Sequence, residues 1–515
     1  MRSRTLFGAL LTLPLALACQ RPAPPAAAPG PATPAANADA PPPEPPTLLE
    51  PPAAGISPEA PFPPIVHASL ENGLGVRIIE RRVHPIVELR LVVRSGSATD
   101  GDKPGLAALA GELLKDGGAG GLSPRQLVER AEALGATLTV RTDRDSTRIS
   151  LGVTSGDFEA ALAILADVAL RPTLPAGELD KLKAREIEAR KSAARGNASW
   201  AAAMVLFREL YELPATVHPY SRYDALPEDI EKIKLADVKR WHKAHFVPAN
   251  ASLVVVGDVS AKDVQVAAEK TFGAWKGDAP PRPSFSMPER PSSSQVYLVD
   301  RPGSPQSQIY VGLLGPERTS PEWPALTVAN QILGGGVSGR LFMDVREKRS
   351  LAYSTSSFVS ELATGPVPLV LSAGTQTEKT EDAVAALLEN LEALATRAPS
   401  EAELEMARRF LADSFVFKLE TVGSVAELAT ALYVLSLPDD HYDQYRRAVR
   451  ELDVAKVAAV AGRRYAGRPV IVVAGDGKAL GPKLARFGEV AVLDPERGFA
   501  LKRSHTPAPA PAPAQ

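Results

Sequence analysis

The sequence predicts an α+β fold built from two similar halves, and three observations lead to that prediction. Residues 253–258 (LVVVGD) recur as 471–476 (IVVAGD), an offset of 218 residues. Residues 113–117 are echoed by 332–335, with paired aliphatic residues before a glycine at an offset of 218 to 219. Two matches at one offset indicate an internal duplication. In each half strand-like and helix-like segments come in blocks, which favours α+β layers with largely antiparallel sheets.

The elements expected in the first half follow from the spacing of apolar residues. Residues 87–93 and 148–153 alternate between apolar and polar side chains, as half-buried strands do. Ser123 and Gln126 form a capping-box-like pair around Pro124, which predicts a helix start, and Gly135 closes that helix. Further helices are expected over 104–115, 157–170 and 176–194.

The second half repeats this order. Strands are expected over 308–314 and near 369–373, and helices before Gly334 and over 381–394 and 400–416. The stretch 279–294 is rich in proline and serine and is predicted to link the halves. The halves are therefore placed at 65–278 and 295–502.

Bulk composition excludes several classes of function. The 515 residues are ample for large cores. Lys and Arg number 58 against 60 Asp and Glu, a net charge of -2, so the basic face of a general nucleic-acid or anionic-membrane binder is not expected. Cys19 is the only cysteine, which excludes an internal disulfide and a Cys-based zinc site.

The N-terminus has the pattern of an export signal. Arg2 and Arg4 precede an apolar stretch, 6–18, that is too short to span a bilayer comfortably and ends in small residues before Cys19. This resembles the bacterial lipobox, which implies a signal peptide over 1–18 and a lipid anchor on Cys19. The alternative is a non-lipidated signal peptide with an incidental cysteine.

Two further segments are expected to lie outside the folded halves. Residues 19–64, rich in proline and alanine, are predicted to be a lipid-anchored tether, and 503–515 a disordered tail. Gln20 stands after the cysteine where aspartate would favour the inner membrane. We therefore expect attachment to the outer membrane, facing the periplasm.

Residues 339–354 (GRLFMDVREKRSLAYS) set Arg346 and Tyr353 seven residues apart at a predicted helix-to-strand junction. A guanidinium and a phenol both donate hydrogen bonds, so the pair can hold a peptide carbonyl and stabilise a developing oxyanion. The alternative is an exposed cation at a helix C-terminus beside a half-buried strand tyrosine. The segment closely resembles the C-terminal half of the insulinase/pitrilysin-like (M16) peptidases, in which such a pair contacts the substrate backbone near the scissile bond.

The resemblance covers almost everything from 70 to 493. It implies that each half consists of two related α/β domains and that the halves close like a clamshell around an extended peptide. In some non-catalytic relatives a glycine-rich loop engages substrate. The matching residues here are Gly334, Gly335 and Gly336, and the loop is short.

Active members of this family carry the motif HxxEH on the first long helix. Its histidines bind zinc and its glutamate activates water. The matching positions here are Ala108, Gly111 and Glu112, and none of the three residues is retained. A more distant glutamate ligand should fall near Glu186 or Glu188. The resemblance therefore implies a degenerate zinc site, with no cofactor bound by this chain and the zinc held by a partner subunit.

His242 and His245 are the one close pair among seven histidines. An i, i+3 pair on a helix can bind a metal ion, but no nearby carboxylate is placed like a third ligand. We therefore predict packing or surface roles for both.

These observations predict a catalytically inactive, substrate-engaging subunit of a heteromeric zinc metallopeptidase. A heterodimer with an HxxEH-bearing M16 subunit would act on extended peptides at the cell envelope, with no nucleic-acid partner. The alternative is a structural or peptide-binding envelope lipoprotein without a role in proteolysis. Independent hydrolysis through another site would need a ligand set that the sequence does not offer.

Overall fold

A computed structural model describes Gly55 and residues 59–211, 218–281 and 295–506. The predicted signal peptide, Cys19 and most of both predicted linkers lie outside the described residues. Within them, no helix has the length and apolar character needed to cross a membrane.

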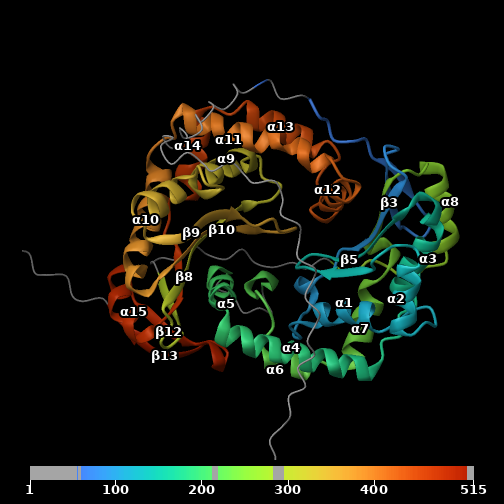
Figure 1. Ribbon diagram of the computed structural model, residues 1–515, viewed down its shortest axis with the longest axis horizontal. Helices are drawn as coiled ribbons and strands as arrows, with labels where there is room; N and C mark the ends of the chain where they lie inside the picture. Colours follow the sequence, from blue (N-terminus) through green and yellow to red (C-terminus); the bar gives the residue numbers. More distant parts are fainter. Residues whose placement is uncertain (1–54, 56–58, 212–217, 282–294, 507–515) are drawn as a thin grey trace, which may run out of the picture. The chain divides into compact units, whose positions relative to one another are not determined.

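The first half forms one six-stranded sheet with the order β1-β2-β6-β3-β5-β4. Figure 1 labels β3 and β5 of this sheet, in which β2 and β6 pair in parallel and the other described pairs are antiparallel. The strands are β1 (Val66–Ser69), β2 (Gly75–Glu80), β3 (Ile86–Val93), β4 (Thr139–Thr142), β5 (Thr147–Thr154) and β6 (Ala251–Gly257). The helices are α1 (Leu106–Asp116), α2 (Pro124–Glu132), α3 (Phe158–Leu170), α4 (Ala176–Gly196), α5 (Ala198–Tyr211), α6 (Pro227–Lys232), α7 (Leu235–His245) and α8 (Ala261–Phe272).

The second half forms one seven-stranded sheet with the order β13-β12-β7-β11-β8-β10-β9. Here β7 pairs in parallel with β11 and β12, and the other pairs are antiparallel. The strands are β7 (Gln295–Asp300), β8 (Gln306–Glu317), β9 (Ala352–Val359), β10 (Pro366–Gln376), β11 (Val470–Gly475), β12 (Val490–Asp494) and β13 (Ala500–His505). The helices are α9 (Trp323–Gly334), α10 (Thr380–Thr396), α11 (Glu401–Asp413), α12 (Val422–Val434), α13 (His441–Arg450), α14 (Val454–Arg464) and α15 (Gly477–Leu484), with a π-helical segment, Phe342–Lys348, before β9.

The predicted α+β class with two homologous halves and largely antiparallel sheets is confirmed. Equivalent strands occupy equivalent places, since β3 and β6 of the first sheet correspond to β8 and β11 of the second. One detail differs from the expectation taken from the resemblance. Each half contains a single sheet among the described residues, so each is one α/β domain and not two.

The local signals that predicted individual elements also hold. Ser123 and Gln126 form the capping box of α2, with Pro124 in its first turn. In β3 the side chains of Val87, Leu89 and Leu91 are buried, as the alternation predicted.

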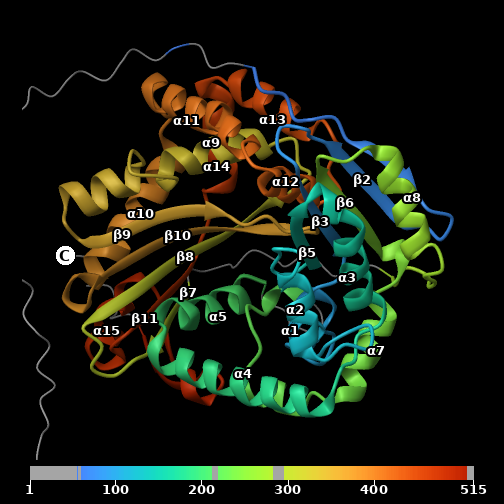
Figure 2. The ribbon, with the colours of Figure 1, turned by 45° about the vertical axis from the view of Figure 1, so that its right-hand side comes forward.

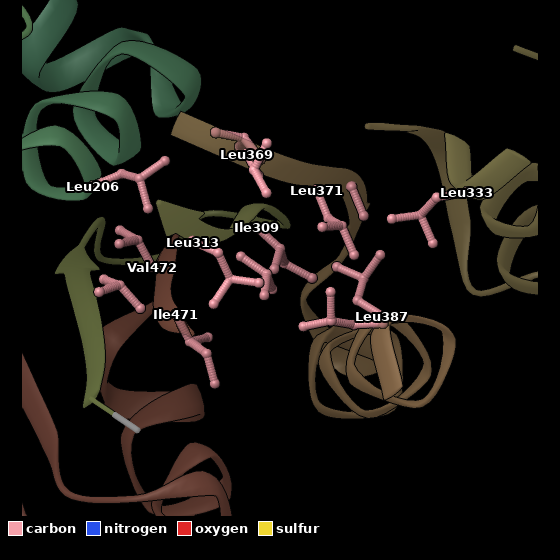
Figure 3. Close-up of a cluster of buried hydrophobic side chains, with 14 of the residues drawn as sticks. Leu206, Ile309, Leu313, Leu333, Leu369, Leu371, Leu387, Ile471 and Val472 are labelled. Carbon is pink, nitrogen blue, oxygen red and sulfur yellow. The ribbon is translucent and has the colours of Figure 1, made fainter. Parts of the chain in front are cut away.

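Helix α5 belongs to the first half by sequence but packs on the sheet of the second half, against β8 and β11. Its Leu206 belongs to the core of the second half and lies beside Val472 of β11 (Figure 3). Leu206 lies so close to β8 that a Cβ atom at Gly312 would be 2.7 Å from its Cδ1. The predicted boundary therefore assigns α5 to the first half, although α5 packs in the core of the second half.

The exchange is reciprocal. Helix α12, from the second half, packs on β3 and β6 of the first sheet (Figure 2). Its Val425 and Leu432 are fully buried in a cluster with Val92 and Val254. Each half thus supplies a helix to the other's sheet.

The repeat-equivalent hairpin turns meet at the centre of this exchange. The Asp145 carboxylate on the β4–β5 turn accepts a hydrogen bond of 3.0 Å from the backbone N–H of Ala363 on the β9–β10 turn. These residues are separated by 218 positions, the offset of the duplication. The hydrogen bond therefore joins two residues at equivalent positions of the two repeats.

The folded part extends slightly beyond the predicted limits at both ends. Phe62, inside the predicted 19–64 tether, is buried against Phe415 and Tyr442, and its N–H donates to the Asp443 carboxylate at 3.2 Å. At the other end β13 pairs with β12 as far as His505, inside the predicted 503–515 tail. The aromatic anchor and the strand pairing explain both differences.

Candidate functional site

Helix α1 carries the positions at which the resemblance places the zinc motif. It begins after Gly105, where the buried Asp100 carboxylate accepts hydrogen bonds from the N–H groups of Gly105 (2.7 Å) and Ala107 (2.8 Å). These bonds satisfy donors that a helix start leaves without partners. One face, with Leu109 and Leu113, is buried in the first core.

The position of the expected glutamate has no room for a side chain. Gly111 packs against β4, and a Cβ atom on it would lie 2.3 Å from Oγ1 of Thr142. Ordinary Cβ atoms do not approach a neighbour this closely. Gly111 therefore lets α1 pack closely on β4.

The position of the second histidine now belongs to an ion-pair cluster. The Glu112 carboxylate accepts hydrogen bonds from Lys115 at 3.0 Å and from Arg185 of α4 at 3.5 Å. The bond to Glu112 raises the pKa of Lys115. Asp116 joins the cluster through Arg185 at 3.7 Å.

These residues do not fit a zinc ion. Ala108 has no donor atom, Gly111 has no side chain, and Glu112 is paired with two cations whose charge would repel Zn²⁺. Across the described ranges, no group of three or more His, Cys, Asp and Glu side chains is placed to hold a metal ion. That the chain binds no cofactor of its own stays a prediction.

The other candidate ligands are also engaged elsewhere. Glu186 pairs with Arg190 at 2.6 Å, and Glu188 pairs with Lys191 at 2.9 Å. The Glu188 pair lies on the exposed face of α4, whereas Arg190 is buried and also pairs with Asp224 at 2.7 Å.

The histidine pair packs inside the first half, as predicted. Nε2 of His242 lies 2.9 Å from the Ala169 carbonyl oxygen, and its ring stacks on Phe246. Nδ1 of His245 lies 2.8 Å from the Ser95 hydroxyl. Burial lowers the pKa of both histidines, that of His245 to about 4.

Arg346 and Tyr353 are both accessible beside the outer strand of the second sheet. Arg346 lies in the π-helical segment and is 45% exposed, with its guanidinium carbon 4.7 Å from the Phe342 ring centroid. Tyr353 is the second residue of β9 and is 53% exposed. Its hydroxyl lies 3.5 Å from Oε1 of Gln306, at the limit of a hydrogen bond.

The sequence did not single out the residue that supports Tyr353. The phenol ring of Tyr353 lies over Gly374 of β10, and a Cβ atom on Gly374 would be 2.6 Å from that ring. An isolated glycine inside a predicted strand often marks such a close approach. Gly374 directly follows the strand predicted near 369–373, and nothing in the sequence connected it with Tyr353.

The three glycines after α9 have different surroundings. Gly334 is buried, and a Cβ atom on it would lie 2.8 Å from the backbone nitrogen of Ser357, so this glycine lets α9 pack closely on β9. Gly335 caps the helix, and Gly336 is exposed. Gly336 is thus the most accessible of the three predicted substrate contacts.

Strand β9 is the edge strand of its sheet beside the Arg–Tyr pair, and Asn330 of α9 donates to its Ser357 carbonyl at 3.2 Å. It is the last strand in the order of its sheet and pairs only with β10 among the described strands. Its exposed side chains include Ser354 and Ser356. An extended peptide can add to such an edge through main-chain hydrogen bonds.

Comparison with family models identifies both halves. Residues 76–212 match the model described as insulinase (peptidase family M16), and residues 232–411 match the model described as the peptidase M16 inactive domain. Together the two matches cover more than half of the chain.

Individual relatives agree with these matches. The zinc protease PqqE of Helicobacter pylori is 24% identical over 406 residues, which are 78% of this chain and 88% of that protein. A crystal structure of a peptidase M16 inactive domain from Pseudomonas fluorescens has a TM-score of 0.72 at 27% identity and covers 80% of this chain and 98% of its own.

A longer solved structure has the same fold. The periplasmic protease PqqL of Escherichia coli has a TM-score of 0.67 at 19% identity, and the match covers 83% of this chain but 47% of PqqL. The fold, the repeat and the family matches lead to one conclusion: the chain belongs to the M16, insulinase-like, peptidase family.

Proposed function

We propose that this chain is a catalytically inactive, substrate-engaging subunit of a heteromeric zinc metallopeptidase. One contrast carries the proposal. The zinc-motif positions on α1 are filled by close packing at Gly111 and ion pairs at Glu112, whereas Arg346 and Tyr353 remain accessible. A second subunit with an intact HxxEH motif would supply the zinc site.

The exchange of helices supports a role for a second chain. Separating the two halves would pull α5 away from the second sheet and α12 away from the first. Exposing buried side chains such as Leu206, Leu210 and Leu432 would cost about 1.5–3 kcal/mol for each. We therefore expect the two halves to act as one leaf of the clamshell, with the partner as the other leaf.

In the proposed complex Arg346 and Tyr353 would position the substrate. The guanidinium and the phenol would donate hydrogen bonds to a peptide carbonyl, and the edge of β9 would hold the adjoining backbone. Gly334, Gly335 and Gly336 would contribute through the segment between α9 and the π-helical segment.

We place this activity at the cell envelope. The lipobox-like sequence ending at Cys19 supports a lipid anchor, and PqqL, which shares the fold, is a periplasmic protease. The alternative is a structural or peptide-binding lipoprotein. It is supported by the contacts that the two side chains make within the chain, since Arg346 packs on Phe342 and Tyr353 packs on Gly374.

Purification of the affinity-tagged, full-length chain from its own membranes tests the proposal. We expect an HxxEH-bearing M16 subunit at near-equal amount, and peptide cleavage by the pair. Arg346→Ala and Tyr353→Phe should each lower turnover by the pair at least about tenfold, as loss of an oxyanion donor does. Lys348→Ala, an exposed cation on the same segment, is the matched control. If both variants cleave peptide at the wild-type rate, the structural alternative is favoured.

A further inference from the structure

The side chain of Tyr353 lies across the neighbouring strand of its sheet. Its ring covers Gly374 of β10, and its hydroxyl lies 3.5 Å from Oε1 of Gln306 on β8. Because the strand order is β8-β10-β9, the side chain begins on β9 and reaches over β10 to the end of β8. Two strands besides its own therefore contact the phenol.

A β-bulge in β9 starts this arrangement. Gly374 of β10 pairs with Ser354 of β9. The next residue of β10, Thr375, pairs with Ala352, so Tyr353 is the extra residue of the bulge. Tyr353 and Ser354 are neighbours and both exposed, which the regular alternation of a half-buried strand would not give. Bulges of this kind re-aim a side chain and are common next to active sites.

Gly374 provides the space that the phenol occupies. A Cβ atom on Gly374 would lie 2.6 Å from Cζ of Tyr353 and 2.7 Å from its Cε2 and hydroxyl oxygen, and these are the three nearest atoms. The φ angle of Gly374 is not left-handed, so backbone strain does not exclude alanine there. An alanine at this position would therefore meet the phenol before any other group.

The first repeat has a glycine at the equivalent place but no covering tyrosine. Gly152 of β5 pairs with Glu88 of β3, as Gly374 of β10 pairs with Gln308 of β8. Gly152 is exposed, whereas Gly374 is buried. A Cβ atom on Gly152 would lie 2.9 Å from Oε2 of Glu88, the end of a flexible side chain. Gly152 is therefore the matched control position for Gly374.

We propose that Gly374 is a positioning residue for Tyr353 in peptide cleavage by the assembled pair. It lets the phenol rest against β10, so that the hydroxyl is held beside the edge of β9 before a peptide carbonyl arrives. A donor held in advance loses little freedom when the oxyanion develops. The contact with Gln306 is at the limit of a hydrogen bond, so a carbonyl can replace it. The inference rests on the proposed function, because it takes Tyr353 as the donor.

The size of the expected effect follows from the contact distances. Carbon atoms in ordinary contact lie about 3.5–4.0 Å apart, so a methyl group at position 374 would move the ring by roughly 1 Å. A misplacement of about 1 Å can lower a rate on the order of 10²-fold. We expect Gly374→Ala to lower kcat of the pair at least about tenfold. KM should change less than about twofold, because Arg346 and β9 still bind the peptide.

Steady-state kinetics of the assembled pair test this expectation. The substrate is the member of a randomised quenched-fluorescence octapeptide set that the wild-type pair cleaves fastest. Gly152→Ala should keep the wild-type kcat. In a chain that already carries Tyr353→Phe, the hydroxyl is absent, so Gly374→Ala should lower kcat by no more than about twofold further. A glycine that only supports the sheet would lower kcat by the same factor in both chains, and that result would overturn the inference.

A second measurement needs neither the partner nor a peptide. The full-length chain in detergent carries 3-fluorotyrosine at position 353, and its fluorine NMR resonance is compared with that of the chain unfolded in urea. We expect the folded wild-type resonance to be shifted, Gly374→Ala to move it toward the unfolded position, and Gly152→Ala to leave it in place. A wild-type resonance at the unfolded position, or one that Gly374→Ala does not move, contradicts the inference without depending on activity.

Tyr353→Phe separates this inference from the proposed function. If this variant of the pair cleaves peptide at the wild-type rate, the proposed function fails, whatever the fluorine resonance shows. If Tyr353→Phe lowers kcat whereas Gly374→Ala does not, the proposed function stands and the positioning role of Gly374 fails.

Discussion

Replacing Leu206 with alanine tests the helix exchange. Leu206 is 1% exposed, and it lies directly on the backbone of β8 at Gly312. Because Gly312 has no side chain to move into the space, the cavity left by the substitution cannot easily be filled. Leu→Ala changes in cores cost about 2–5 kcal/mol, and we expect the upper part of that range here.

Native-state hydrogen exchange read by mass spectrometry can follow both sheets in one experiment. Strands β6 and β11 lie inside their sheets and should exchange only through large openings. Since α5 and α12 tie the sheets together, Leu206→Ala should lower the opening free energy of both strands by similar amounts. Val128→Ala, at an exposed position of α2, should change either value by less than about 0.5 kcal/mol.

Two outcomes would refute this reasoning. If β11 keeps its wild-type protection, Leu206 does not stabilise the second core. If β11 loses protection while β6 keeps it, the halves open independently and cannot form one rigid leaf.

Three further changes test other parts of the structure. Gly111→Ala should cost about 1–3 kcal/mol by overpacking against Thr142, and Thr142→Ala in the same chain should recover most of it in urea unfolding. Between about pH 6.5 and 4 the unfolded chain protonates His245 while the folded chain does not, so the free energy of unfolding should fall as pH falls through this window, and less steeply in His245→Gln. Phe62→Ala should lower the melting temperature, because Phe62 is buried in the cluster that contains Phe415 and Val425.

The repeat and most helices and strands could be predicted because their signals are short patterns of residues in the sequence. The alternation around Leu89 and the capping box at Ser123 both depend on residues a few positions apart. The partner of α5 was not predictable in this way. Its apolar residues, such as Leu206 and Leu210, indicate burial but not which sheet buries them.

The candidate site could also be predicted from the sequence only in part. The absence of HxxEH could be seen by comparing α1 with the family motif. The cluster that replaces it could not, because Glu112 and Arg185 lie 73 positions apart and meet only when α1 packs on α4.

The duplication itself gives a reason to expect a partner. Subtracting the repeat offset from Arg346 and Tyr353 leads to Val128 and Gly135, so the first half has no donor pair at the corresponding places. Adding the offset to Glu112 leads to Asn330, whose side chain donates to the Ser357 carbonyl of β9 at 3.2 Å. The second half therefore cannot replace the zinc motif that the first half lacks. Each repeat retains at most one part of a family active site, so the proposed function requires a second chain that carries the HxxEH motif.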